Sequence, residues 1–131
     1  MKIDGIIMLS KRIKNIENLE NEFRELFNSD EAKVKNVVYF FMSEIPVPRV
    51  LGESNILYIG KTEQTIRRRY LQHSDKLANN RSGRFYKHII NNYGGLKMGY
   101  IETDTPKETE KKYFDQYCEE YLEFPPKSKV G

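Results

Sequence analysis

ILYIGKTEQTIRRRYLQH, residues 56–73, is the part of the chain from which the fold prediction starts. It opens with a short run of β-branched and aromatic residues that ends at Gly60, which is typical of the end of a buried strand. After a polar turn, a helix is predicted from about Thr65. On a helix that advances about 100° per residue, Arg69 and His73 share a stripe with apolar residues. Charged side chains rarely face a core unless they are paired or functional, so the strand and the helix indicate a site.

Length and composition predict one soluble globular domain. The chain has 131 residues, of which 38% are hydrophobic and 31% are charged. It contains neither an apolar run of about 18 residues that could span a membrane nor a signal-peptide pattern. Cys118 is the only cysteine, which excludes an internal disulfide and fits a reducing compartment. We therefore expect a cytoplasmic protein that contacts no membrane and binds no small-molecule cofactor.

Basic residues are concentrated between residues 61 and 87, here called the basic segment. It carries eight Lys and Arg residues against two acidic ones, a net charge of +6, and the rest of the chain carries 14 basic and 17 acidic residues. A concentrated basic strip is typical of a protein that binds a polyanion. A solvated helix face is the alternative. The eight residues are Lys61, Arg67, Arg68, Arg69, Lys76, Arg81, Arg84 and Lys87.

The N-terminal part is predicted to end in an amphipathic helix. Residues 1–9 are expected to form a short strand or an ordered arm. Apolar residues then recur every three or four positions over residues 10–28, with Ser10 as the helix N-cap. This helix is expected to cover one face of a sheet, and a dimer interface or a contact with nucleic acid is the alternative.

Three strands are predicted in the rest of the chain. Residues 34–42 are β-branched and aromatic with little alternation, as in a central strand. Residues 55–60 form the return strand, and residues 96–103 form the third strand. Two prolines in residues 43–54 cannot donate to a β-ladder, so this link is expected to be a loop or an irregular hairpin.

Two more helices complete the prediction, over residues 83–92 and from Thr105 to about Leu122. No linker or repeat divides the chain, so residues 1–131 are expected to form a single domain. Its parts are an N-terminal extension with the amphipathic helix (1–33), a core (34–124) and a short tail (125–131).

Five polar residues could together hydrolyse a phosphodiester bond. Glu110 falls within the apolar stripe of the last helix, where a carboxylate is paired, holds a metal ion or lies at the rim of the core. Tyr39 and Tyr58 lie near the ends of two apolar strands, where simple packing is the alternative. With Arg69 and His73, these groups could neutralise a phosphate, transfer protons and bind a divalent cation.

The order and spacing of these residues resemble the GIY-YIG nuclease family over residues 36–122. The matching elements are Val37-Val38-Tyr39, Tyr58-Ile59-Gly60, Arg69 with His73, and the helical Glu110. The resemblance implies a stand-alone catalytic domain, a small α/β domain of the α+β type. It implies a three-stranded, mainly antiparallel sheet flanked by helices. It also implies endonuclease activity, the hydrolytic cleavage of DNA with one Mg²⁺ or Mn²⁺ ion.

The same resemblance implies a role for each residue. Tyr39 would help to activate the attacking water, and Tyr58 would join its hydrogen-bond network. Arg69 would bind the phosphate, and His73 would transfer a proton or position a reacting group. Glu110 would be the metal ligand.

DNA is the expected partner, held through its phosphates without sequence reading. The expected phosphate contacts are Lys61, Arg67, Arg68, Arg81, Arg84 and Lys87. The alternative is a catalytically inactive module on the same fold that binds nucleic acid or protein. It is favoured by the valines of the first motif and by the lack of an asparagine in residues 124–131. The spacing of 19 positions from Tyr39 to Tyr58 is a further departure from the family, where the hairpin is usually shorter. The sequence leaves the oligomeric state open, a dimer included.

Overall fold

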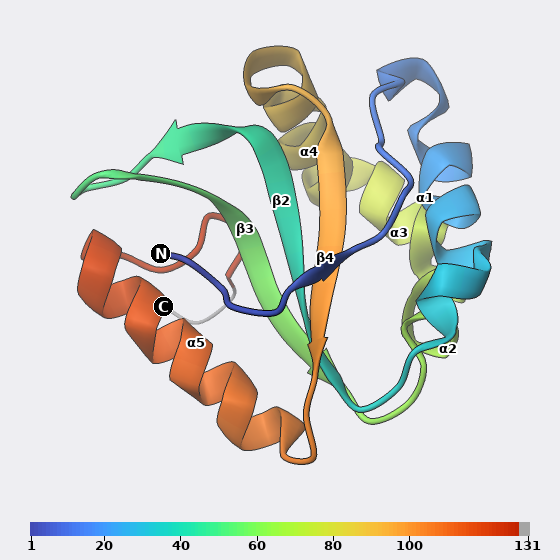
Figure 1. Cartoon of the computed structure of the whole chain (residues 1–131). Helices are drawn as coiled ribbons and strands as arrows, with labels where there is room; N and C mark the ends of the chain where they lie inside the picture. Colours follow the sequence, from blue (N-terminus) through green and yellow to red (C-terminus); the bar gives the residue numbers. More distant parts are fainter. Residues whose placement is uncertain (129–131) are drawn as a thin grey trace.

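A four-stranded antiparallel sheet with helices on both faces forms the protein (Figure 1). The computed structural model describes residues 1–128. The strand order is β1-β4-β2-β3, and the strands are β1 (Ile7–Met8), β2 (Val37–Pro48), β3 (Glu53–Thr62) and β4 (Leu96–Glu102). The α+β fold class predicted from the sequence is therefore confirmed.

The predicted number of three strands is wrong, because the N-terminal arm adds β1 to the sheet. Ile7 pairs with Tyr100 and Met8 pairs with Gly99 of β4. The expectation of a short strand in residues 1–9 is thereby confirmed. A strand of two residues is too short to show an alternating pattern, so its place in the sheet depends on its partner.

The helices lie in two groups, one on each face of the sheet (Figure 1). The first group comprises α1 (Leu19–Asn28), α2 (Ile66–Tyr70), α3 (Ser74–Ala78) and α4 (Asn80–Tyr93). The second face is covered by α5 (Pro106–Tyr121) and by residues near the N-terminus. The short 3-10 helices are η1 (Ile16–Asn18), η2 (Asp30–Lys33) and η3 (Leu71–His73). Within residues 1–128, no helix combines the length and the apolar character that a membrane crossing requires.

The predicted start of the first helix at Ser10 is wrong, although its function in the fold is as expected. The backbone N–H groups of Leu9 and Ile13 donate to the carbonyls of Met98 and Leu96, at 2.8 and 2.9 Å. These bonds hold the first part of the predicted helix beside β4, so α1 begins later. The buried side chains of α1 still cover the sheet.

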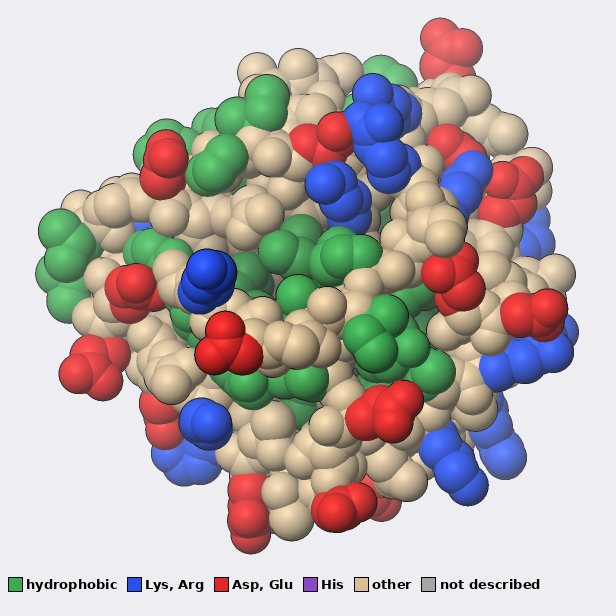
Figure 2. All heavy atoms as spheres, in the orientation of Figure 1, with side chains coloured by type: hydrophobic (Ala, Val, Ile, Leu, Met, Phe, Trp, Pro, Cys, Tyr) green, Lys and Arg blue, Asp and Glu red, His purple; other side chains and the backbone are tan. Residues whose placement is uncertain are grey.

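Ion pairs fix the charged residues of this N-terminal region. Over the face drawn in Figure 2, Lys and Arg side chains are interspersed with Asp and Glu side chains. Every basic residue in residues 10–33 forms an ion pair within 4.0 Å, namely Lys11, Arg12, Lys14, Arg24 and Lys33. The counter-charges come from acidic residues of the same region and, for Arg12 and Lys14, from Glu44 on β2.

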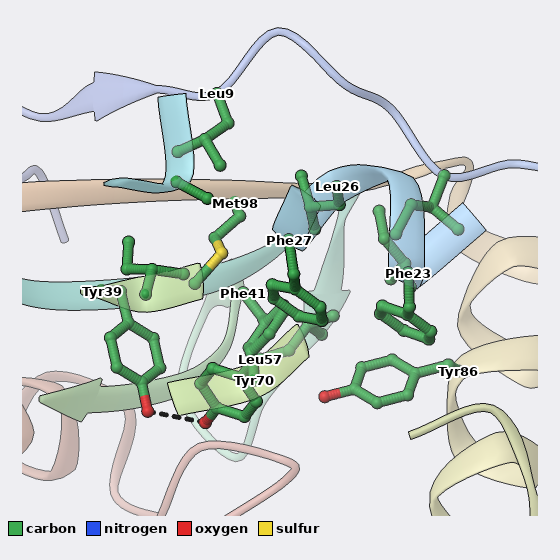
Figure 3. Packing of buried hydrophobic residues seen from close by; sticks show 14 of the residues in the cluster. Leu9, Phe23, Leu26, Phe27, Tyr39, Phe41, Leu57, Tyr70, Tyr86 and Met98 are labelled. Atoms are coloured by element: carbon green, nitrogen blue, oxygen red, sulfur yellow. Dashed lines mark hydrogen bonds between the residues drawn. The ribbon is translucent and has the colours of Figure 1, made fainter. Parts of the chain in front are cut away.

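The central strand β2 is buried on both faces, as its apolar pattern predicts. Val37, Tyr39 and Phe41 pack against α1 to α4 in an aromatic cluster (Figure 3). Val38 and Phe40 point to the other face and pack against α5. Successive side chains of β2 therefore belong to two different cores, one on each face of the sheet. The larger core contains Tyr39, a predicted site residue.

Residues 43–54 adopt the hairpin that was one of the two expected forms. Strands β2 and β3 continue through this segment, and their pairing register shifts between Met42 and Val47. The tail predicted over residues 125–131 is described as far as Ser128, and residues 129–131 lie outside the described residues.

The single helix predicted from Thr65 is divided into α2, η3 and α3. The hydroxyl of buried Ser74 donates to the carbonyl of Leu71 at 3.0 Å, in competition with the helical backbone bonds. The apolar stripe continues across this break, so a periodic pattern cannot detect it.

Candidate active site

Two hollows meet at Tyr58 on β3. The first, of about 280 Å³, is bounded by β3 and by the segment α2–α4, and we call it the basic hollow. Besides Tyr58, it is lined by Arg69, Tyr70, His73, Lys76, Tyr86 and Lys127, among others. The second, of about 420 Å³, lies between β3 and α5, and we call it the Glu110 hollow. Besides Tyr58, its lining includes Glu110, Lys111, Phe114, Asp115 and Ser128.

The five residues predicted from the sequence gather around this point. Tyr58, Arg69 and His73 line the basic hollow, although the helix that was expected to carry the last two is broken. Glu110 reaches Tyr58 from the other side of the sheet edge. Tyr39 lies behind them, in the core. The sequence therefore identified residues that are brought together from β2, β3, α2, η3 and α5.

The hydroxyl of Tyr39 forms a hydrogen bond with a second tyrosine, Tyr70. Tyr39 is 1% exposed, and its hydroxyl oxygen lies 2.6 Å from that of Tyr70, in a hydrogen bond (Figure 3). Burial, followed by the neighbouring Tyr70, raises the pKa of Tyr39 far above its usual range. Burial also raises the pKa of Tyr70, to about 12. Both phenols therefore stay neutral and serve as hydrogen-bond partners.

Gly60 is required by the position of Tyr39. The two residues pair across β2 and β3, and a Cβ atom at Gly60 would lie 2.5 Å from the ring and from the hydroxyl of Tyr39. Any side chain at this position would displace the tyrosine. The glycine after Tyr58-Ile59 thus has a physical reason, which is the passage of an aromatic ring over the strand.

Tyr58 lies between charges of opposite sign. It is half-buried, and its pKa is raised first by burial and then by the negative charge of Glu110. The positive charge of Arg69 lowers the same pKa. Tyr58 is thus influenced by a carboxylate and by a guanidinium, and it lines both hollows.

Glu110 is a half-buried carboxylate without an ion-pair partner in residues 1–128. Burial raises its pKa, and the positive charge of Lys61 opposes that effect. Glu108 and Glu119 are exposed on the far side of α5, as their spacing predicts. Asp115, which was predicted to share that side, is also exposed but lines the Glu110 hollow, where it forms an ion pair with Lys111. A partly desolvated carboxylate is stabilised by a cation, so this position favours metal binding.

A single carboxylate fits the requirements of Mg²⁺. Within residues 1–128, no group of three or more His, Cys, Asp and Glu side chains could hold a metal ion. Mg²⁺ commonly keeps several waters and binds through one or two carboxylates together with the phosphate oxygens of a substrate. Glu110 would be the protein ligand in such a site.

Arg69 and His73 give the basic hollow its character. Arg69 is exposed, and its guanidinium carbon lies 5.1 Å from the ring centroid of Tyr70. His73 is half-buried in η3. No acidic residue of the described chain lines this hollow, whereas two lysines, Lys76 and Lys127, do. The hollow is therefore suited to an anion.

None of the eight residues of the basic segment forms an ion pair with a residue in 1–128. Lys61 lies near Glu110, and Arg67 and Arg68 line a shallow groove on α2. Arg81 and Arg84 are exposed on α4.

Lys87 is the predicted phosphate contact that lies apart from the others. It lines a separate small hollow near η1, together with Glu17 and Glu20. Among the predicted phosphate contacts, Lys87 therefore has the least support from its surroundings.

The basic hollow is also lined by residues that were not predicted as site residues, among them Tyr70, Lys76, Tyr86 and Lys127, although Lys76 was counted in the basic segment. Tyr70 and Tyr86 looked like ordinary core aromatics, but both line the basic hollow. Tyr86 is buried, and burial followed by the neighbouring tyrosines raises its pKa. Lys127 belongs to the tail, whose place beside β3 depends on a contact between distant parts of the chain. The stripe that Tyr70 shares with Arg69 was the one signal available in the sequence.

No protein-family model, no curated protein and no solved structure matches the chain. The case for a function therefore depends on the side chains around Tyr58 and on the charge of the basic segment. The resemblance to the GIY-YIG nucleases consists of the order and spacing of motifs in the sequence.

Proposed function

We propose that the protein is an endonuclease that hydrolyses phosphodiester bonds in DNA with one Mg²⁺ or Mn²⁺ ion. The observation that carries this proposal is the position of Tyr58 between Arg69 and Glu110, where the two hollows meet. One hollow offers cations to a phosphate, and the other offers a carboxylate to a metal ion. Both groups favour hydrolysis of a phosphodiester when they act on the same phosphate.

Arg69 and His73 act on the phosphate side. The guanidinium of Arg69 donates to the non-bridging oxygens and neutralises the charge that develops on them. His73 lies within the same hollow and can deliver a proton to the leaving oxygen or hold the phosphate in place.

Glu110 and Tyr58 act on the water side. Glu110 would hold the divalent ion, which would supply Lewis-acid polarisation of a phosphate oxygen and lower the pKa of a bound water. Tyr58 orients the attacking water through its hydroxyl, which is the one phenol of the pair Tyr39 and Tyr58 that reaches the hollows.

Tyr39 is a positioning residue in this proposal. Its hydroxyl holds that of Tyr70, and its ring lies over Gly60, two residues from Tyr58 along β3. It can therefore fix the geometry of the site without touching the substrate.

The basic segment supplies affinity for the DNA backbone. Like charges without counter-charges repel one another, and a polyanion relieves that repulsion. The expected binding is strongly salt-dependent and reads no sequence.

Cleavage of supercoiled plasmid and of branched DNA tests the proposal, with Mg²⁺ or Mn²⁺ and with a chelator as control. Wild type is expected to nick DNA only with metal, and Glu110→Ala is expected to lower the rate at least about 100-fold. The matched control is Glu108→Ala, because Glu108 is exposed on the same helix and faces away from the site.

Two results would contradict the proposal. Salt-sensitive DNA binding without cleavage by wild type would support the inactive binding module instead. Cleavage that survives Glu110→Ala would show that Glu110 is not the essential metal ligand.

A further inference from the structure

The chain after α5 is tied to the rest of the protein at several points. The ring of Phe124 stacks on that of Phe114, with centroids 5.4 Å apart and an interplanar angle of 25°. The carbonyl of Phe124 accepts a hydrogen bond from Arg49 at 2.7 Å. Pro125 is buried. The chain therefore leaves α5 in a defined direction.

These contacts bring residues 125–128 beside Tyr58. The backbone N–H of Lys127 donates to the carbonyl of Leu57 at 2.9 Å, and the N–H of Ser128 donates to that of Pro125 at 3.0 Å. The second bond closes a turn, and the first attaches this turn to β3. Because Leu57 directly precedes Tyr58, the turn lies at the meeting point of the two hollows.

The two side chains after Pro126 face different hollows. Lys127 lines the basic hollow, and Ser128 lines the Glu110 hollow, so the turn borders both. The ammonium nitrogen of Lys127 lies 5.9 Å from the ring centroid of Phe85 on α4. Its stem therefore runs from β3 towards α4, along the wall of the basic hollow.

We infer that Lys127 is a phosphate-binding residue of the active site and that residues 125–128 complete its wall. This inference rests on the proposed function. With Arg69 and Lys76, Lys127 gives the hollow three cations from different parts of the chain, and no acidic residue in 1–128 lines it. A lysine acts as a point charge on a phosphate, whereas Arg69 offers a fork of donors.

The test compares Lys127→Ala with Lys127→Arg and with the control Lys107→Ala, an exposed lysine of α5. The bond to Leu57 comes from the backbone, so all three variants should fold, and equal Tm values would check this. Two quantities are measured on a short DNA duplex. They are kcat/KM with Mg²⁺, and the salt dependence of DNA affinity with Ca²⁺ in place of Mg²⁺.

Lys127→Ala is expected to lower kcat/KM about 10- to 100-fold and to reduce the slope of log K against log salt by about one. Lys127→Arg should keep most of both, and Lys107→Ala should change neither. If wild type cleaves and Lys127→Ala matches it in both quantities, the inference is wrong and the proposed function stands. A different result is that wild type does not cleave, while Lys127→Ala is the only variant in which the slope of log K against log salt falls by about one. In that case the phosphate contact stands and the proposed function is wrong.

Discussion

Two basic regions of this protein differ in how their charges are balanced. In residues 10–33, all five basic residues form ion pairs with nearby carboxylates. In the basic segment, none of the eight does so with any residue in 1–128. Residues 10–33 carry six acidic residues against five basic ones, whereas the basic segment carries two against eight, so the difference lies in where the acidic residues are placed.

The difference distinguishes charges that are neutralised within the folded protein from charges that are available to a ligand. Paired surface charges add little stability each, but they leave no uncompensated field. A concentration of unpaired cations opposes folding and attracts polyanions. Glu110 is the acidic counterpart beside this segment, a half-buried carboxylate that forms no ion pair with a residue in 1–128. Both kinds of unbalanced charge meet at Tyr58.

The largest effect that would sharpen this comparison is on catalysis. Arg69→Ala is expected to lower the DNA cleavage rate by about 100- to 1000-fold, because it removes a donor that stabilises the phosphate charge. Arg24→Ala, from the paired region, should leave the rate unchanged. Single-turnover cleavage of a labelled duplex measures both. Equal rates in the two variants would remove the distinction between the regions.

A substitution at Gly60 tests whether the packing of Tyr39 affects both the stability of the fold and the rate of cleavage. Gly60→Ala is expected to lower the free energy of unfolding by about 1–3 kcal/mol, since its Cβ must displace the ring of Tyr39. The same displacement should slow cleavage. Urea unfolding gives the stability, and Tyr39→Phe is the companion variant that keeps the ring and removes the hydrogen bond to Tyr70. Unchanged stability in Gly60→Ala would show that the ring can move without cost.

Glu110→Gln is expected to stabilise the metal-free protein at neutral pH. Burial raises the pKa of Glu110 above its ordinary value of 4.5, so its ionisation is easier in the unfolded chain. Wild type therefore loses stability relative to the variant as the pH rises above 4.5, and the loss is complete above the raised pKa.

Thermal unfolding across this pH range measures the difference in Tm between wild type and Glu110→Gln. Mn²⁺ should narrow it by raising the Tm of wild type alone. Glu108→Gln serves as the exposed control on the same helix. A metal-dependent rise in Tm that is equal in Glu110→Gln would place the ion elsewhere.

The smallest expected effect concerns the paired region. Lys11→Ala should lower the free energy of unfolding by no more than about 1 kcal/mol, because its pairs with Glu22 and Glu25 are partly solvated. Its DNA affinity should equal that of wild type. Arg67→Ala should show the reverse, with lower affinity and unchanged stability. Chemical unfolding and fluorescence anisotropy with labelled DNA provide the two measurements.

Local patterns predicted most of the fold. The apolar runs located β2, β3 and β4, and the 3.6-residue period located α4 and α5. The remainder depends on contacts between distant parts of the chain. Such contacts are the pairing of β1 with β4 and the backbone bonds that hold residues 9 and 13 against β4. No propensity within those residues could reveal them.

The same limit applies to the candidate site. Helical phase placed Arg69 and His73 on one side, and the structure keeps them in one hollow despite the break after Tyr70. The hydrogen bond between the hydroxyls of Tyr39 and Tyr70 and the position of Lys127 follow from packing between distant segments. The sequence could therefore identify candidate reactive groups, but not the residues from distant segments that line the hollow around them.

The central claim is that the basic segment binds the phosphate backbone of DNA beside the site. Its most direct test is the salt dependence of DNA affinity in two charge-matched triple variants. One combines Arg67→Gln, Arg68→Gln and Arg84→Gln, and the other combines Lys14→Gln, Arg24→Gln and Lys33→Gln. The first is expected to lose about three units of slope in log K against log salt, and the second is expected to lose none. Equal slopes for the two variants would contradict the account.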